Sequence, residues 1–109
     1  MLFRSPALED GDLVLFESLA INLHIARKVG PPLLPAGDDG SRVLQWTLWA
    51  ATEAEPHVMR WGYNTYIKPA AERDAAEAKA GAEALTQRLV VLEGELAARP
   101  FLEIGRAHV

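Results

Sequence analysis

The fold of the first part of the chain is decided by the stretch SPALEDGDLVLFESLAI, residues 5–21. It predicts a short strand, a tight turn at Asp10-Gly11, a second strand over 13–16 and a helix that begins at Glu17-Ser18, because Asp-Gly pairs favour hairpin turns. The second strand meets the helix without a spacer, so the free N–H groups of the first helical turn and the Ser18 hydroxyl point at one spot. We expect an anion site there, and a carboxylate would fit it.

Ser18 is also expected to be the N-cap residue of this helix, since serine leads the N-cap preferences. Ile21 stands three residues later, where a Glu or Gln would complete a reciprocal capping box. The helix entrance is therefore predicted to stay open to an external anion.

Composition and charge limit the classes of function. The chain has 109 residues, of which 50% are hydrophobic, enough for a globular protein with a core. Its formal net charge of −4, without a cluster of Lys and Arg, argues against a nucleic-acid or anionic-membrane surface. No apolar run approaches the roughly 20 residues of a membrane span, and no signal peptide is recognisable, so we expect a cytoplasmic protein. With no cysteine, these residues hold neither a disulfide nor a thiol nucleophile.

The middle of the chain predicts a helix, a linker and a longer helix. Apolar spacing over 19–28 suits a mostly buried helix that stops at Gly30-Pro31-Pro32. After a linker over 30–40, Asp39 or Ser41 can cap a helix that runs towards residue 66 and ends at 68–69. Pro56 removes a backbone donor within it, and a bend or break is expected near residues 54 and 55.

The last predicted element is a helix over 70–98, closed by Arg99-Pro100. It carries an apolar stripe at three- and four-residue steps, made of Ala78, Ala82, Leu85, Leu89, Leu92 and Leu96. Small residues on this stripe allow a close approach to the preceding long helix. Two long antiparallel helices are therefore expected.

The Pro-x-Leu segment at 6–8, the Asp-Gly turn and the Glu-Ser-x-Ala-Ile segment at 17–21 together resemble the glutathione-binding end of the thioredoxin-like domain of glutathione S-transferases. The run LAARPFL at 96–102 resembles the end of the second helix in that family's helical domain, although this match is less specific. The resemblance covers nearly all of residues 5–102. It implies a mostly helical α+β fragment: a β-hairpin plus helix from the thioredoxin-like domain, followed by a long antiparallel helical hairpin of the C-terminal domain.

The resemblance also implies domain boundaries. Residues 1–29 would form the C-terminal part of the thioredoxin-like domain, 30–40 the linker, and 41–102 the start of the all-helical domain. Met1 would then fall inside a domain whose first strand, first helix and second strand precede it. Residues 103–109 are expected to be a non-native tail, because Ile104–Val109 can be encoded by ATC GGA AGA GCA CAC GTC, which looks like a common sequencing adapter.

Four residues are implied to bind glutathione: Ser5, Pro6, Glu17 and Ser18. The family's matching proline is cis and turns the backbone of the preceding residue outward, where it pairs with the cysteinyl part of glutathione like an added strand. Ser18 and its N–H would hold the γ-glutamyl carboxylate, and Glu17 would help hold the ammonium group.

The family's electrophile site implies Trp49, Glu53 and His57 as pocket residues or partner contacts. Further candidates on the same long helix are Trp46, Thr52, Trp61 and Tyr63. Aromatic residues at helical spacing also suit core or dimer packing, and both alternatives remain open. Glu53 and His57 alone are too few ligands for a metal site, so no metal is predicted. His24 is expected to be structural.

The resemblance implies a glutathione transferase that joins the glutathione thiol to small electrophiles, with glutathione as substrate, and that forms a homodimer. The thiol-activating Ser, Tyr or Cys belongs to a strand outside these residues, so no catalytic residue is assigned and this piece alone should be inactive. Three alternatives remain: a non-catalytic transferase-like docking module of translation complexes; a peroxidase, isomerase or reductase on the same scaffold; and a helical-hairpin interaction protein in which Pro6 would be trans.

Overall fold

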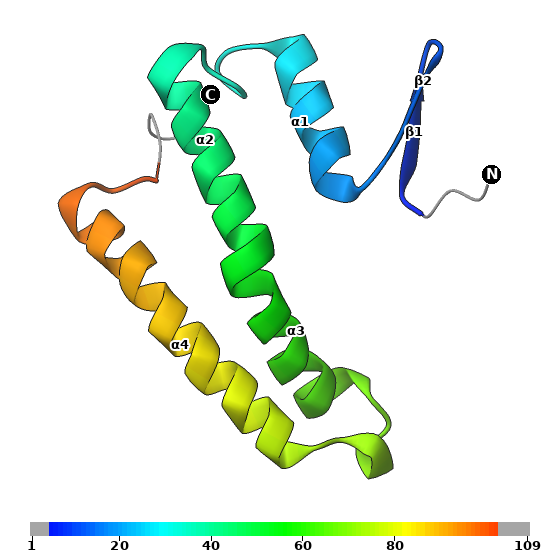
Figure 1. Ribbon diagram of the computed structural model, residues 1–109, viewed down its shortest axis with the longest axis vertical. Coiled ribbons are helices and arrows are strands. Elements are labelled where there is room, and N and C mark those ends of the chain that lie inside the picture. Colours follow the sequence, from blue (N-terminus) through cyan, green and yellow to red (C-terminus); the bar gives the residue numbers. More distant parts are fainter. Residues whose placement is uncertain (1–4, 103–109) are drawn as a thin grey trace. The chain divides into compact units, whose positions relative to one another are not determined.

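The computed structural model describes residues 5–102, and the segments 1–4 and 103–109, which include the expected non-native tail, lie outside the described residues. The contacts divide the chain into two compact units, one up to Val43 and one from Leu44 (Figure 1). The domain boundaries expected from the sequence stay a prediction.

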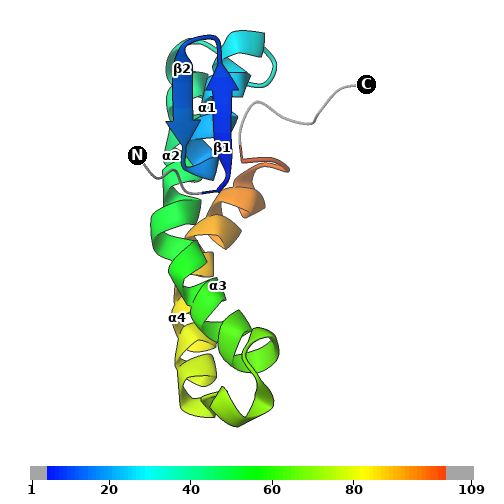
Figure 2. The same cartoon turned by 90° about the vertical axis from the view of Figure 1, so that its right-hand side faces the viewer.

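The first unit begins with the expected hairpin and helix (Figures 1 and 2). Strands β1 (Ala7–Asp10) and β2 (Leu13–Phe16) pair antiparallel, and Gly11 takes a φ of +62° in the turn between them. Helix α1 (Ser18–Val29) follows after one residue. It has no buried residue, so the expectation of a mostly buried helix is wrong for the described chain: its main contacts with other described elements are with the two strands of the hairpin.

Helix α2 (Gly37–Trp49) begins earlier than expected. Asp39 and Ser41 both lie inside it, so neither is its cap, and that prediction is wrong. Asp39 instead pairs with Arg42 one turn later, and an acidic residue in the first turn favours the helix by its position near the positive end of the helix dipole.

In the second unit, a π-helical turn at Ala50–Ala54 joins α2 to α3 (Glu55–Gly62), and a second π-helical turn, Tyr63–Ile67, follows. The distortion expected at Pro56 is present, as a widened turn rather than a break. Pro56 has no N–H for the carbonyl four residues earlier, and such wide turns accommodate a disturbed hydrogen-bond ladder. Lys68 is extended and ends the helical path, as predicted.

Helix α4 (Ala75–Ala98) begins later than expected, after a short 3-10 turn at Ala70–Glu72. Asp74 sets the start: its Oδ1 accepts from the N–H groups of Ala76 and Glu77 at 3.0 and 3.1 Å. The backbone N–H of Asp74 donates in turn to Oδ1 of the buried Asn64. The expected end before Arg99-Pro100 is confirmed.

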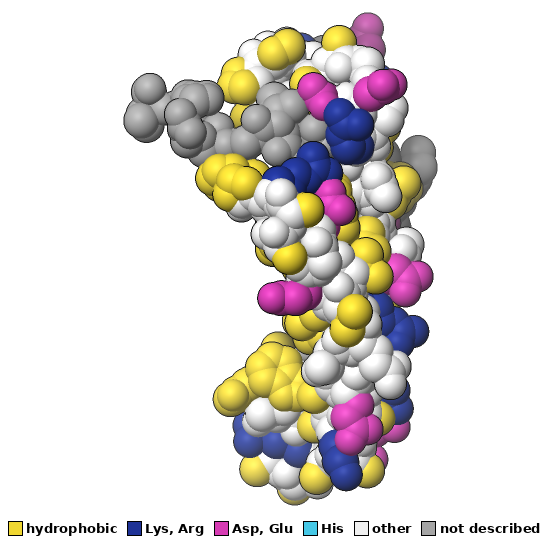
Figure 3. All heavy atoms as spheres, turned by 90° about the vertical axis from the view of Figure 1, so that its left-hand side faces the viewer, with side chains coloured by type: hydrophobic (Ala, Val, Ile, Leu, Met, Phe, Trp, Pro, Cys, Tyr) yellow, Lys and Arg dark blue, Asp and Glu magenta, His cyan; other side chains and the backbone are white. Residues whose placement is uncertain are grey.

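Helices α3 and α4 pack against each other as the expected antiparallel hairpin (Figure 1). Even so, none of the hydrophobic residues within 5–102 is buried, although the composition would allow a core. Hydrophobic side chains are visible on the surface among the charged ones (Figure 3), and Tyr66 and Ile67 are 67% and 63% exposed. Of the helices described, none is long and apolar enough to cross a membrane.

The Arg60–Glu77 ion pair links α3 to α4 and should make stability depend on pH. Arg60 Nε and Nη2 donate to Glu77 Oε2 and Oε1 at 2.6 and 2.9 Å. This hydrogen bonding lowers the pKa of Glu77 from its ordinary value of 4.5. A carboxyl group whose pKa is lowered by folding stabilises the folded state above its ordinary pKa, and that contribution disappears as the pH falls through the lowered value.

We therefore expect the free energy of unfolding to decrease more steeply from about pH 5 to about pH 3 in the unmutated protein than in Glu77→Gln. Urea titrations at a series of pH values measure this difference. Glu83→Gln is a matched control, because Glu83 makes only a long pair with Lys79 at 3.8 Å on the surface of α4. Identical pH profiles for the unmutated protein and Glu77→Gln would contradict the prediction.

Candidate functional site

The open end of the hairpin brings together the residues expected to form an anion site. Ala7 pairs with Phe16 in the sheet register, so Pro6 and Glu17, the next residues outward on the two strands, lie at the same end. The Ser5–Pro6 peptide bond is cis, as expected. Ser5, Pro6, Glu17 and Ser18 are all exposed. The structure thus brings the two segments that flank the hairpin, residues 5–6 and 17–18, to the same exposed end of it.

Glu17 carries the change of direction from β2 to α1. Its φ is 75° and its ψ is 113°, and it is the one non-glycine residue with positive φ among residues 5–102. Such a conformation costs of order 1–3 kcal/mol and clusters at functional sites. Glu17 is also the N-cap, because its carbonyl accepts the first helical hydrogen bond, from Ile21 N at 3.0 Å. Ser18 is the first residue inside the helix, and its expected N-cap role is wrong.

Within residues 5–102, no side chain closes the N-terminus of α1: no side-chain hydrogen bond caps it, and no acidic residue occupies its first turn. The first N–H groups of a helix have no acceptor inside the helix, and they favour a bound anion. The N–H groups of the first turn and the exposed Ser18 hydroxyl therefore offer donors to a carboxylate, and the preceding residue, Glu17, carries an exposed carboxylate that suits a cationic group.

A cluster of charged and polar groups joins the other end of the hairpin to α1. Asp10 Oδ2 lies 2.7 Å from His24 Nε2 and accepts from Lys28 Nζ at 2.8 Å. The hydrogen bond from Lys28, followed by that from His24, lowers the pKa of the Asp10 carboxyl. His24 is only 11% exposed by its side chain, in line with the structural role expected for it.

Sequence reasoning missed Asp10, which was taken only as part of the turn. The sequence signal that could have found this contact is the i, i+4 spacing of His24 and Lys28. It places both side chains on one face of the helix that follows the hairpin, where they can share an acidic partner. A hollow of about 320 Å³ lies along this contact. Its lining residues are Leu8, Glu9, Asp10, His24, Ile25, Lys28 and Val29.

The expected electrophile residues lie in the second unit and already have neighbours there. Trp49 stacks edge-to-face with Trp46 at a ring-centroid distance of 5.5 Å. Glu53 Oε2 lies 3.5 Å from Arg88 Nε on α4. His57 is half-buried, and its backbone carbonyl lies close to Gly81. The two alternatives for these residues, packing or a ligand pocket, remain predictions.

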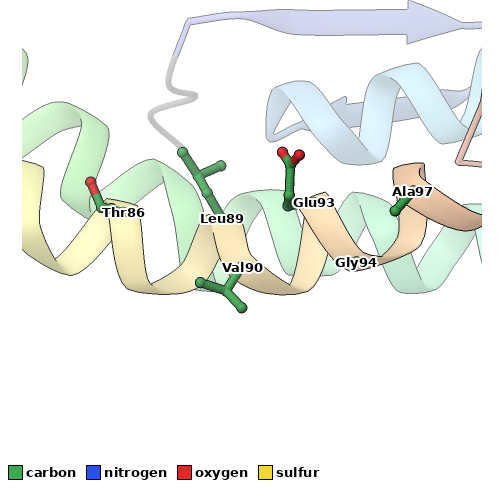
Figure 4. A pocket seen from close by; sticks show the side chains of 6 residues that line it. All are labelled: Thr86, Leu89, Val90, Glu93, Gly94 and Ala97. Carbon is green, nitrogen blue, oxygen red and sulfur yellow. The ribbon is translucent and has the colours of Figure 1, made fainter.

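A hollow of about 490 Å³ in the second unit does not involve these candidates. Its described lining residues all belong to α4: Thr86, Leu89, Val90, Glu93, Gly94 and Ala97. Figure 4 shows Leu89 and Glu93 pointing to one side of α4 and Val90 to the other. Within residues 5–102, His, Asp and Glu side chains form no group that could hold a metal ion.

Comparisons with known proteins agree with the geometry of the hairpin. The family model described as "Glutathione S-transferase, N-terminal domain" matches residues 2–27, which include all four predicted binding residues. Glutathione S-transferase 3 from Zea mays is 36% identical over 102 residues, covering 89% of this chain and 46% of that protein. The family model and this relative support a member of the glutathione S-transferase family. The chain spans about half the length of this relative.

A solved structure agrees with the glutathione S-transferase fold over both units. Ure2p5 from Phanerochaete chrysosporium, cocrystallized with 1-(S-glutathionyl)-2,4-dinitrobenzene, is 30% identical. It matches with a TM-score of 0.79 over 93% of this chain and 49% of that one. The predicted fold class, a hairpin and helix of a transferase N-terminal domain followed by helices of its C-terminal domain, is confirmed. Elongation factor 1-gamma from Prunus avium is also similar, at 32% identity over 106 residues, covering 91% of this chain and 24% of that protein.

Proposed function

We propose that the protein binds glutathione at the open end of the hairpin. The backbone of Ser5 pairs with the cysteinyl part of the tripeptide, next to the cis bond to Pro6. Ser18 and the first N–H groups of α1 hold the γ-glutamyl carboxylate, and Glu17 pairs with its ammonium group. A carboxylate at a helix N-terminus and an oppositely charged group beside an ammonium are both favourable at this range.

One observation carries the proposal: the N-terminus of α1, uncapped by any side chain of residues 5–102, lies at the same end of the hairpin as the backbone of Ser5 and Pro6. The strained Glu17 backbone supports it, because a fold does not keep such a conformation without tertiary support. The glutathione conjugate named with Ure2p5 supports the ligand class.

The whole protein is proposed to join the glutathione thiol to small electrophiles. We assign no catalytic residue to this chain, because the family's thiol-activating Ser, Tyr or Cys has no counterpart here. Trp49, Glu53 and His57 are proposed to line the electrophile pocket or to contact a partner. A cytoplasmic homodimer belongs to the same proposal. Reduction, isomerisation or peroxide chemistry with glutathione would use the same binding residues, since one scaffold hosts several reactions.

The similarity to elongation factor 1-gamma favours a second candidate, a docking module without catalysis. Such a module would keep the fold and the Glu17-Ser18 pair. The two candidates differ in one residue outside this chain: a Ser, Tyr or Cys at the thiol position supports an enzyme, and an apolar residue supports docking.

Retention on immobilised glutathione tests the proposal, with the full-length gene product. We expect retention, elution by free glutathione, and formation of a conjugate when a dinitrobenzene electrophile is added. Light scattering on the same sample should give the mass of a dimer. Binding without conjugation would favour docking or another glutathione reaction, and no binding at millimolar glutathione would overturn the proposed function.

A further inference from the structure

We propose that Asp10 is a positioning residue for glutathione: by clamping α1 to the hairpin, it fixes the direction in which the first turn of α1 presents its donors. This inference rests on the proposed function, and it adds a residue that does not touch the ligand. Asp10 lies at the turn end of the hairpin, opposite to the end that carries Pro6 and Glu17.

The clamp has one acceptor and two donors. Asp10 is the last residue of β1 and pairs with Leu13, so the sheet holds its backbone. Its Oδ2 is within 2.7 Å of His24 Nε2 and 2.8 Å of Lys28 Nζ, which lie one turn apart on α1. A single carboxylate oxygen therefore joins the hairpin to two successive turns of the helix.

Glu17 is the hinge that this clamp opposes. It alone separates β2 from α1, and its φ of 75° lies outside the range that a side chain other than glycine prefers. Relaxation of this φ would rotate the whole of α1 about the hinge. Strained backbone of this kind persists only where the surrounding structure restrains it.

The two donors of the clamp lie far along α1 from the hinge, so a small rotation at Glu17 displaces them strongly. At a rise of about 1.5 Å per residue, His24 and Lys28 lie about 9 and 15 Å along the axis from Ser18. A rotation of about 4–6° at the hinge would move these anchors by about 1 Å, enough to break hydrogen bonds of this length. Groups that bind a ligand must be held within about 10–20° of their productive orientation. The clamp would break at a smaller rotation than this, so it restrains the direction of α1 tightly enough.

Little else in the described chain holds α1 in this direction. The helix has no buried residue, so packing restrains it weakly. His24 is the best-protected member of the clamp, with a side chain only 11% exposed, while Lys28 is 58% exposed. The Nδ1 atom of His24 is buried without a partner among the described residues, so Asp10 supplies this ring's one hydrogen bond there. The lowered pKa of Asp10 keeps its carboxylate charged at neutral pH.

The test compares Asp10→Asn with Asp12→Asn in the full-length gene product. Asp12 is an exposed carboxylate in the same turn and forms no hydrogen bond or ion pair with another described residue. We expect Asp10→Asn to raise the Kd for glutathione by about three- to tenfold, and the control to leave it unchanged. Isothermal titration is done well below the melting temperature of each variant, so only folded protein is compared. Asp10→Glu, which keeps the charge, should recover part of the affinity.

A second pair of variants guards against misfolding of Asp10→Asn. Lys28→Met removes an exposed donor, and Arg27→Met removes its neighbour, which has no partner in the described chain. Lys28→Met should raise the KM for glutathione while the KM for the electrophile stays constant.

A merely structural clamp would lower the melting temperature and leave both the Kd and the KM for glutathione unchanged, and that result overturns the inference alone. If the unmutated protein does not bind glutathione, the proposed function fails, and this inference falls with it.

Discussion

Replacement of Ser18 with alanine is expected to weaken glutathione binding by about 1–3 kcal/mol, the range for a lost hydrogen bond to a charged group. The hydroxyl is exposed at the first position of α1, beside N–H groups that the helix itself leaves unpaired. In the proposed complex it donates to the γ-glutamyl carboxylate. Isothermal titration with glutathione on the full-length gene product measures the change as a rise in Kd of about 5- to 150-fold.

Ser41→Ala provides the matched control, because Ser41 is an exposed serine inside α2 and not at a helix N-terminus. It should leave the Kd unchanged. Ser18→Thr keeps the hydroxyl and should retain most of the affinity. Ser18 is not the N-cap, so Ser18→Ala should change the melting temperature little. If Ser18→Ala binds as tightly as Ser41→Ala, the carboxylate does not use this hydroxyl, and the site as proposed is wrong.

The arrangement of the elements could be predicted because local chemistry decides it. Asp10-Gly11 favours the turn, Glu17-Ser18 begins the helix directly after the strand that ends at Phe16, and Pro56 disturbs the long helix. Each of these signals acts over one to four residues. The pairing of Ala7 with Phe16 then follows from the turn, and it brings Pro6 and Glu17 together without information from elsewhere in the chain.

The details that failed depend on contacts between distant residues. The conformation of Glu17, which moves the N-cap away from Ser18, depends on how α1 lies on the hairpin. The start of α4 depends on Asp74, whose backbone is held by Asn64 in the preceding turn. Asp10 acts on residues two turns into the next helix. Propensity alone cannot reveal such pairings, because Asp and Asn also favour turns and caps through local hydrogen bonds that need no distant partner.

The small residues of the apolar stripe predicted that α4 would lie close to the preceding long helix. The closest contact between α3 and α4 is at Gly81, however, and Gly81 is not part of that stripe. A Cβ built at Gly81 would lie 2.8 Å from Trp61 N and 3.0 Å from His57 O. Both are backbone atoms of α3, so no side-chain rotation can relieve the overlap. Gly81 is also buried, unlike the other glycines of the helical hairpin.

Gly81→Ala is therefore expected to lower the free energy of unfolding by about 1–3 kcal/mol, the usual cost of overpacking, although alanine is the better helix former. Gly94→Ala is the control on the same helix, because nothing lies within 4 Å of its added Cβ. There the higher helix propensity should act alone and raise stability by up to about 1 kcal/mol. Urea titrations of the two variants measure opposite shifts of the midpoint. If both substitutions stabilise the protein equally, α3 and α4 do not approach as closely at Gly81 as the backbone distances require.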